Sequence, residues 1–165
     1  MNIFLDLDQV LGDFDGHVKT LFGSTPKELG DKRLWALVEG VPDFWLTEPL
    51  MKDAEALWQA LCPYNPTILT GCPRTGHDRA VAQKTRWVHG HFGSHVPVIA
   101  CFSKHRQDHM EAPGDLLVDD RIGNLRRWED AGGIGILHEN CADTVLKVDY
   151  IATVHHLSAV GRLRS

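Results

Sequence analysis

The feature that most constrains the fold of this chain is a regular alternation between short apolar runs and stretches with helical spacing. The apolar runs are brief and nearly continuous, and they cover residues 3–5, 67–69, 96–101, 116–118 and 134–137. Runs of this kind are typical of strands covered on both faces, as in a parallel sheet. The stretches between them repeat apolar residues every three or four positions, which indicates amphipathic helices. We therefore expect an α/β fold: a three-layer, Rossmann-like parallel sheet with right-handed crossovers.

The segment 16–52 interrupts this alternation. It contains three prolines, several glycines and a group of aromatic residues. We predict that it forms a small, mainly helical cap inserted after the first strand. Such an insertion would lie above the carboxyl ends of the sheet, where open α/β folds bind their ligands. Residues 1–165 would then form a single domain that contains the cap.

The charge of the chain limits its partners. Its 165 residues include 17 Lys plus Arg and 22 Asp plus Glu, so the formal net charge is −5. A net negative chain is not drawn to nucleic-acid phosphates or anionic lipids unless it has a local positive pocket. We therefore expect a small-molecule partner, with no duplex nucleic acid and no membrane. The oligomeric state is left open.

The cysteines and the first residues indicate a compartment. Cys62, Cys72, Cys101 and Cys141 form no Cys-x-x-Cys pair, which argues against a zinc knuckle or a redox dithiol and favours reduced, mostly buried thiols. The chain reaches Asp6 without the basic segment and long apolar run of a secretory signal. No run reaches membrane-spanning length. We expect a soluble, cytoplasmic protein.

Two of the apolar runs lead into paired acids. Alternate side chains of a strand share a face, so Asp6 and Asp8 could point to the same side where the first strand ends. Asp119 and Asp120 end the run 116–118. Helix capping by Asp120 would account for only one acid of this second pair. Four carboxylates gathered at one sheet edge repel one another unless a cation binds them, and Mg²⁺ takes such oxygen ligands.

A possible phosphate site lies between the two acidic strands. The run 67–69 leads into Thr70 and Gly71, which offer a hydroxyl and an unobstructed backbone N–H. Both groups are donors that phosphate oxygens accept from. A Thr-Gly pair after a strand is by itself an ordinary turn. Its place between the acidic strands favours phosphate binding.

In this order the features resemble the haloacid dehalogenase (HAD) superfamily of phosphotransferases. The family pattern is an apolar strand with Asp-x-Asp-x-(Thr/Val), a strand ending in Thr or Ser, a Lys, and a strand ending in paired Asp. This sequence matches it with Asp6-Leu7-Asp8-Gln9-Val10, then Thr70, then Lys84 or Lys104, then Asp119-Asp120. Segments 8–15, 84–88 and 114–120 resemble the 5'(3')-deoxyribonucleotidase branch of that superfamily.

The resemblance implies a phosphoric monoester hydrolase that works through an aspartyl-phosphate, with (deoxy)nucleoside monophosphates as the leading substrates. Asp6 would be the nucleophile and a metal ligand. Asp8 would protonate the leaving alkoxide and then activate water, while its backbone carbonyl binds Mg²⁺. Asp119 and Asp120 would complete the metal site. The sequence does not say which of these two binds the ion directly.

A lysine would offset the charge that builds on the transferring phosphoryl group. Lys84 fits the branch's Lys-x-Arg-Trp motif, whereas Lys104 follows the third strand, closer to the usual superfamily position. The spacing from Lys104 to Asp119 is longer than the branch usually has, which makes Arg106 a rival. Either lysine could instead be a solvated surface charge.

Aromatic residues near the proposed cap could bind a nucleobase by stacking. Phe14 matches an aromatic of the branch's substrate pocket, and Trp45 lies where the branch places cap aromatics. These residues could equally pack the cap onto the core, and the sequence leaves both interpretations open. For Trp35 and Trp58, which lie at apolar helical positions, we expect packing.

Other functions are compatible with the same residues. The closest are hydrolysis of another small phosphomonoester, such as a sugar phosphate, or of a polynucleotide 3'-phosphate end. An open basic groove would favour the nucleic-acid end, and the acidic charge balance argues against it. An alternative from another class is a non-catalytic phosphoacceptor or phosphate-binding module. A receiver domain carries its paired acids near the first strand and a lone Asp on the third, unlike this chain.

Overall fold

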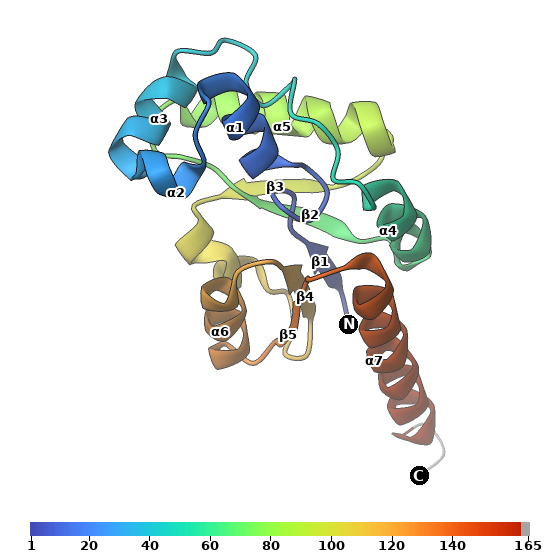
Figure 1. Ribbon diagram of the computed structural model, residues 1–165. Coiled ribbons are helices and arrows are strands. Elements are labelled where there is room, and N and C mark those ends of the chain that lie inside the picture. Colours follow the sequence, from blue (N-terminus) through green and yellow to red (C-terminus); the bar gives the residue numbers. More distant parts are fainter. Residues whose placement is uncertain (163–165) are drawn as a thin grey trace.

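The protein is built on an all-parallel sheet in the computed structural model (Figure 1), which describes residues 1–162, without the side chains of residues 103, 104 and 156–162. The strands are β1 (Ile3–Leu5), β2 (Thr67–Gly71), β3 (Val98–Cys101), β4 (Leu116–Asp119) and β5 (Ile134–Leu137), in the spatial order β3-β2-β1-β4-β5. Each predicted strand is present, and the α/β fold class is confirmed. The third strand begins at Val98 rather than residue 96, because Pro97 has no N–H for the ladder.

Helices cover both faces of the sheet (Figure 1). One face carries α4 (Ala54–Leu61), followed by the short 3₁₀-helix η1 (Cys62–Tyr64), together with α5 (His77–Phe92) and α7 (Cys141–Arg162); the other carries the 3₁₀-helix η2 (Ser103–His109) and α6 (Ile122–Asp130). Even α7, with 22 residues, lacks the apolar character needed to cross a membrane, and so do the other helices among the described residues.

The alternation of side chains along β1 explains why this run is apolar throughout. Ile3 and Leu5 pack into the core on the α4 side, whereas Phe4 packs into the core on the α6 side. Successive residues of a strand point to opposite faces, and both faces are covered here. The Phe4 ring meets the edge of Trp128 with 5.1 Å between ring centroids. The indole N–H of this buried tryptophan donates to the Asp115 carbonyl at 2.9 Å.

The segment between β1 and α4 forms a helical insertion (residues 14–53). It contains α1 (Phe14–Phe22), α2 (Pro26–Leu29) and α3 (Asp31–Glu39), and residues 40–53 contain no helix. The first helix begins at Phe14, two residues before the predicted boundary, because Asp13 caps it: Asp13 Oδ1 accepts from the Gly16 N–H at 2.9 Å. Apolar side chains of the insertion, Val18 among them, form a second core cluster, which we call the insertion's apolar cluster. Ala80 of α5 also belongs to it, so the cluster joins the insertion to the rest of the domain.

The strand order determines where a ligand can bind. From β1 the chain moves to one side through β2 and β3, and it then returns to the other side of β1 through β4 and β5. In open α/β sheets the crevice at such a switch point, outside the carboxyl ends of the strands, is the usual ligand site. Leu5 pairs with Val118, so the residues that follow them, Asp6 and Asp119, leave the sheet side by side.

Replacing Trp128 with alanine should lower the free energy of unfolding by about 3–5 kcal/mol, because it removes the packing against Phe4 and leaves a cavity. Trp128→Phe retains a ring beside Phe4 and loses the hydrogen bond to Asp115, so its loss should be smaller, about 1–3 kcal/mol. Urea unfolding followed by circular dichroism measures both. Equal losses in the two variants would contradict the dominant role of ring packing.

Candidate active site

Three carboxylates meet at the carboxyl ends of β1 and β4. Asp6 follows β1, Asp119 ends β4, and Asp120 comes next; one oxygen of each lies within 4.8 Å of the others. Asp6 and Asp119 are buried and Asp120 is half-buried. Their positions follow from the strand pairing, since the Asp6 N–H donates to the Val118 carbonyl at 2.9 Å. Three of the four predicted acids are thus brought together by the sheet.

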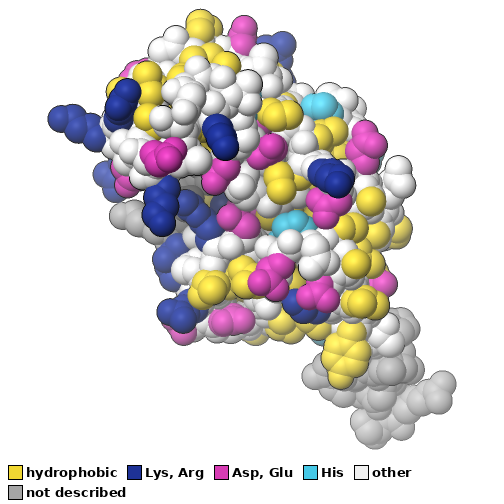
Figure 2. Space-filling model, in the orientation of Figure 1, with side chains coloured by type: hydrophobic (Ala, Val, Ile, Leu, Met, Phe, Trp, Pro, Cys, Tyr) yellow, Lys and Arg dark blue, Asp and Glu magenta, His cyan; other side chains and the backbone are white. Residues whose placement is uncertain are grey.

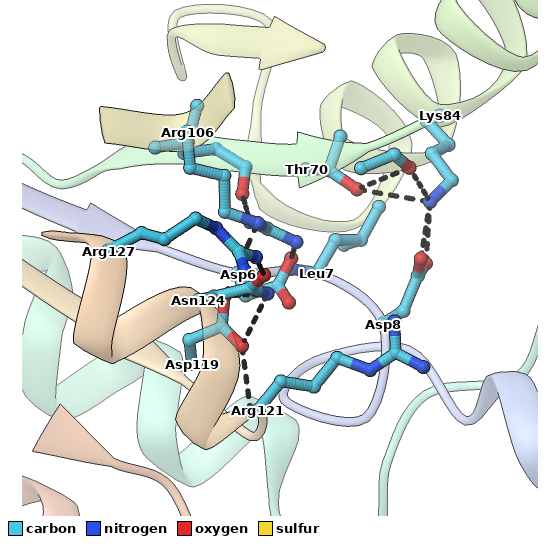
Figure 3. Close-up of polar contacts among 12 residues, drawn as sticks. Asp6, Leu7, Asp8, Thr70, Lys84, Arg106, Asp119, Arg121, Asn124 and Arg127 are labelled. Atoms are coloured by element: carbon cyan, nitrogen blue, oxygen red, sulfur yellow. Dashed lines mark hydrogen bonds and ion pairs between the residues drawn. The ribbon is translucent and has the colours of Figure 1, made fainter. Parts of the chain in front are cut away.

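A buried guanidinium lies among these acids (Figure 3). Arg106, on η2, is 3% exposed; its Nη2 donates to Asp6 Oδ1 at 2.8 Å, and its Nε lies 3.3 Å from Asp119 Oδ2. Arg106 Nη1 also donates to the Leu69 carbonyl on β2. The sequence identified Arg106 only as a rival to Lys104. In the fold Arg106 supplies the positive charge at the centre of the acidic group.

The orientation of Asp119 is fixed from the start of α6. Asp119 Oδ1 accepts from the Arg121 N–H at 2.8 Å, and Asp119 Oδ2 accepts from Asn124 Nδ2 at 2.8 Å. Asn124 is held in turn by Arg127 Nη2, which donates to its Oδ1 at 2.7 Å. Asp120 makes no capping bond to α6, so helix capping does not explain it. Asn124 was not among the predicted site residues, and its position on the first turn after the paired acids was the available signal.

Lys84 joins several predicted residues in a second group (Figure 3). Its wholly buried ammonium, on α5, donates to both oxygens of Asp8 at 2.7 and 2.6 Å. The same Nζ donates to Thr70 Oγ1 at 3.0 Å and to the Gly71 carbonyl at 2.9 Å. The Asp8 carboxylate is therefore paired with Lys84 and is not part of the group around Asp6.

The lysine ammonium also lies over an aromatic ring of the insertion. Lys84 Nζ is 4.4 Å from the centroid of Trp45, a distance at which a cation is attracted to the ring face. The neighbouring Gln83 accepts from the Trp45 N–H at 3.3 Å through its Oε1. Of the two candidate lysines, Lys84 thus lies in the site, and the Lys104 side chain lies outside the described part of the chain.

Glu48 is a further acid that the sequence analysis missed. It is 5% exposed, and its Oε1 has no hydrogen-bond partner among the described residues. Burial raises the pKa of Glu48 well above its ordinary value, the charge of Asp8 adds to this effect, and Lys84 opposes it. Glu48 is held in place through its backbone carbonyl, which accepts from Trp87 Nε1 at 2.7 Å. A carboxyl with a raised pKa therefore lies beside the Lys84–Asp8 pair.

Burial also perturbs the acids at the strand ends. It raises the pKa of Asp6 to about 7; Arg106 opposes this rise, and the nearby Asp119 carboxylate adds to it. Burial and the charge of Asp6 raise the pKa of Asp120 to about 6. In the absence of a metal, the fold therefore favours protons on carboxyls that an ordinary aspartate would have lost.

The donor set at the strand ends fits Mg²⁺. Asp6, Asp119 and Asp120 offer carboxylate oxygens, which are the ligands that this hard cation prefers. Arg106 supplies one positive charge against these three carboxylates. A divalent ion would balance the remaining negative charge. Among the described residues, no other cluster of His, Cys, Asp and Glu has comparable spacing.

A cavity of about 540 Å³ opens in front of these groups. Its lining includes Asp6, Asp8, Gly71, Arg106 and Asp120 on the sheet side, and Phe14, Lys27, Leu34, Trp35 and Trp45 on the insertion side. The other predicted residues, Thr70, Lys84 and Asp119, are fully buried and do not line it. Figure 2 shows basic side chains gathered on the left of the view, where the insertion faces the rest of the molecule.

Three aromatic side chains, those of Phe14, Trp35 and Trp45, line the cavity. Phe14 and Trp45 stack on each other with 5.7 Å between ring centroids and an interplanar angle of 15°. Trp45 is 2% exposed, so little of its ring is free for a base. The packing prediction for Trp35 is incomplete, because Trp35 packs on the insertion's apolar cluster and also lines the cavity. Trp58 packs against the main core as predicted.

All four cysteines are free. Cys72 and Cys101 are buried, whereas Cys62 is exposed, so the prediction of mostly buried thiols is wrong for Cys62. Cys72 lines the cavity, and burial raises its pKa to about 11. A thiol with that pKa is protonated at neutral pH and is a poor nucleophile.

Asp6→Asn should become more stable relative to the wild type as the pH rises from about 4 to about 7. The pKa of Asp6 is raised from 3.8 to about 7, so in this window the folded wild type binds a proton that the unfolded chain has lost. Wild-type stability therefore falls with rising pH, and asparagine removes this contribution. Urea unfolding in EDTA at several pH values measures the difference, which should level off above about pH 7. A constant difference across the window would contradict the raised pKa.

Comparisons with known proteins bear on the fold. No family model matches this chain, and no curated protein does. Several solved structures resemble it. A HAD-superfamily hydrolase from Ehrlichia chaffeensis has a TM-score of 0.54 at 15% identity, over 92% of this chain and 96% of the other. A haloacid dehalogenase-like hydrolase from Streptococcus pneumoniae has a TM-score of 0.55 at 13% identity, over 82% and 83% of the two chains.

A hydrolase from Streptococcus pneumoniae TIGR4 has a TM-score of 0.50 at 12% identity, over 90% of this chain and 97% of the other. These identities are low, so the similarity concerns the arrangement of the backbone. It extends over most of each chain. The chain therefore shares the overall fold of solved HAD-superfamily hydrolases.

Proposed function

We propose that this protein is a Mg²⁺-dependent phosphomonoester hydrolase that forms an aspartyl-phosphate on Asp6. The observation that carries the proposal is the meeting of Asp6, Asp119 and Asp120 at the switch point of the sheet, with Arg106 between Asp6 and Asp119. Such a group binds a dianionic ester only if cations neutralise it. The similarity in fold to HAD-superfamily hydrolases supports the same chemistry.

In the first step a carboxylate oxygen of Asp6 attacks phosphorus, and the bond from phosphorus to the leaving oxygen breaks. This covalent route divides the displacement into two easier steps. Asp6 is oriented for it by the Leu7 N–H, which donates to its Oδ1 at 2.7 Å, and by Arg106. Bound Mg²⁺ would supply charge neutralisation between the nucleophile and the phosphate. Arg106 offsets the negative charge from the protein side.

Asp8 is the proposed general acid and base. It gives a proton to the leaving alkoxide, and it then takes one from the water that attacks the aspartyl-phosphate. Lys84 donates to both Asp8 oxygens and to Thr70 Oγ1. A phosphate oxygen would compete for the same ammonium. Movement of Lys84 toward the phosphate would release the Asp8 carboxyl from its two hydrogen bonds and leave it free to act on the leaving oxygen.

Within this reaction class we propose a (deoxy)nucleoside monophosphate as the substrate, as in the 5'(3')-deoxyribonucleotidase branch. The cavity of about 540 Å³ lies in the range of small-molecule sites. Phe14 and Trp35 line it and could contact a base. The net charge of −5 opposes a polynucleotide substrate. The four free cysteines suit the reducing cytoplasm, where we propose that the enzyme acts.

Phosphate release should be fastest with deoxynucleoside monophosphates in a Mg²⁺ screen that also contains ribonucleotides, sugar phosphates and 3'-phosphorylated oligonucleotides. Asp6→Asn should lower the turnover number roughly 10³-fold or more, because it removes the nucleophile. The control is Asp143→Asn, an exposed acid on α7, which should retain activity. Release from no substrate would favour a phosphate-binding module, and an active Asp6→Asn variant would require another nucleophile.

Removal of divalent ions with EDTA should stop phosphate release, and added Mg²⁺ should restore it. A second readout is independent of turnover: Mg²⁺ should raise the melting temperature of the wild type, because a ligand that binds the folded state stabilises it. The double variant Asp119→Asn/Asp120→Asn lacks two of the proposed ligands and should show a much smaller rise. A wild-type melting temperature that does not respond to Mg²⁺ would contradict the metal assignment.

A further inference from the structure

Gln9, the residue after Asp8, has an unusual backbone conformation. Its φ is 62°, in the left-handed region, and among the described residues only Asn65 (φ 51°) shares a positive φ without being glycine. Asparagine adopts this conformation several times more readily than other side chains, whereas glutamine has no such advantage. Strained backbone of this kind persists where the surrounding structure imposes it, often at ligand sites. A glycine would fit the position with less strain.

The side chain of Gln9 is anchored at one end. Its Oε1 accepts from the Asp15 N–H, in the first turn of α1, at 3.2 Å, and its own N–H donates to the Gly12 carbonyl at 2.7 Å. With the carbonyl oxygen engaged in this way, the amide NH₂ is the outward end of the group. Among the described residues, Gln9 Nε2 donates to no protein atom.

Gln9 lies between the acidic site and the insertion. It lines the cavity together with Asp8 and with Phe14 and Asp15 of α1, and it is half-buried there. In the proposed reaction the phosphorus faces Asp6 and the leaving oxygen faces Asp8. The part of the substrate beyond that oxygen then extends past Gln9 toward the insertion.

We propose that Gln9 determines specificity: its Nε2 donates hydrogen bonds to hydroxyl or ether oxygens of the leaving group, as a sugar ring presents them. This inference rests on the proposed hydrolase function and identifies the leaving group as the part of the substrate that Gln9 contacts. A neutral amide suits uncharged oxygens, whereas the phosphate is matched by the cations Arg106 and Lys84. The bond between Gln9 and Asp15 fixes the amide before the substrate arrives, which lowers the entropic cost of binding.

A purely structural role would account for the Oε1 of Gln9 but not for its Nε2. The Oε1 of Gln9 satisfies one N–H at the start of α1, where Asp13 already accepts from Gly16. That role gives no reason for a residue with a left-handed backbone at the cavity wall, nor for its second amide group, the Nε2. The two roles predict different kinetics, because a structural defect affects all substrates and a lost donor affects only substrates that carry an acceptor.

The test is Gln9→Gly, which suits the left-handed backbone and removes the amide. The matched control is Asn65→Gly, which makes the same backbone change at the end of η1, where Asn65 is exposed. Steady-state kinetics with Mg²⁺ use two probes: deoxyuridine 5'-monophosphate, whose leaving group is a sugar, and phenyl phosphate, whose leaving group offers no hydroxyl or ether acceptor beyond the ester oxygen. Thermal melting and inhibition by inorganic phosphate are measured alongside.

Gln9→Gly should raise KM for deoxyuridine monophosphate about 5–10-fold, the loss expected for one neutral hydrogen bond. Its kcat/KM for phenyl phosphate and its inhibition by inorganic phosphate should stay within about 2-fold of the wild type, and its melting temperature within about 4 °C. Asn65→Gly should leave both substrates unchanged.

The outcomes separate this inference from the proposed function. If Gln9→Gly hydrolyses the nucleotide with wild-type KM, or loses both substrates equally, the specificity role is wrong and the hydrolase proposal stands. If the wild type hydrolyses neither probe nor any member of the phosphate-release screen, the hydrolase proposal itself fails and this inference fails with it.

Discussion

The constraint on which the site depends is the burial of carboxylates side by side. Parallel pairing of β1 with β4 places Asp6 and Asp119 at adjacent strand ends, and Asp120 follows directly. In that environment the charged forms are costly, which is why the pKa of Asp6 rises to about 7 despite Arg106. Carboxylates clustered in this way at the carboxyl ends of the strands favour a bound cation. The three carboxylates outnumber the single guanidinium of Arg106, which is why we propose a bound divalent cation. That cation would in turn attract the anionic substrate.

Lys84, a second buried cation, connects the sheet to the insertion. Lys84 reaches from α5 to Asp8, Thr70 and Gly71, and its ammonium also lies over Trp45. A buried lysine of this kind is stable only when all its donors are used. Because one of its neighbours belongs to the insertion, a phosphate that draws Lys84 away from Asp8 would also change a contact of the insertion. The cavity wall and Asp8, the proposed general acid, are thus linked through a single side chain.

Sequence patterns predicted the strands well, because each run is covered on both faces and must be apolar throughout, as Ile3 to Leu5 illustrate. They also predicted that Asp6 and Asp119 would meet, since parallel strands end at the same edge. They were less successful with side chains on connecting segments. The position of Arg106 depends on how η2 crosses the strand ends, and no periodicity in residues 103–109 encodes that path. Glu48, in the part of the insertion without a helix, was missed for the same reason. Trp35 lies on α3, and its place at the cavity depends on how the insertion packs against the sheet.

The sequence by itself determined the α/β class, the strands and the pairs of acids that follow them, because hydrophobic periodicity and residue type are local properties. Only the tertiary structure decided which charges meet. It separated Asp8 from the group around Asp6 by pairing it with Lys84, and it placed Arg106 between Asp6 and Asp119. It also imposed the left-handed backbone at Gln9. Such pairings depend on distances between segments that are far apart along the chain, and electrostatic energy depends on those distances and on burial.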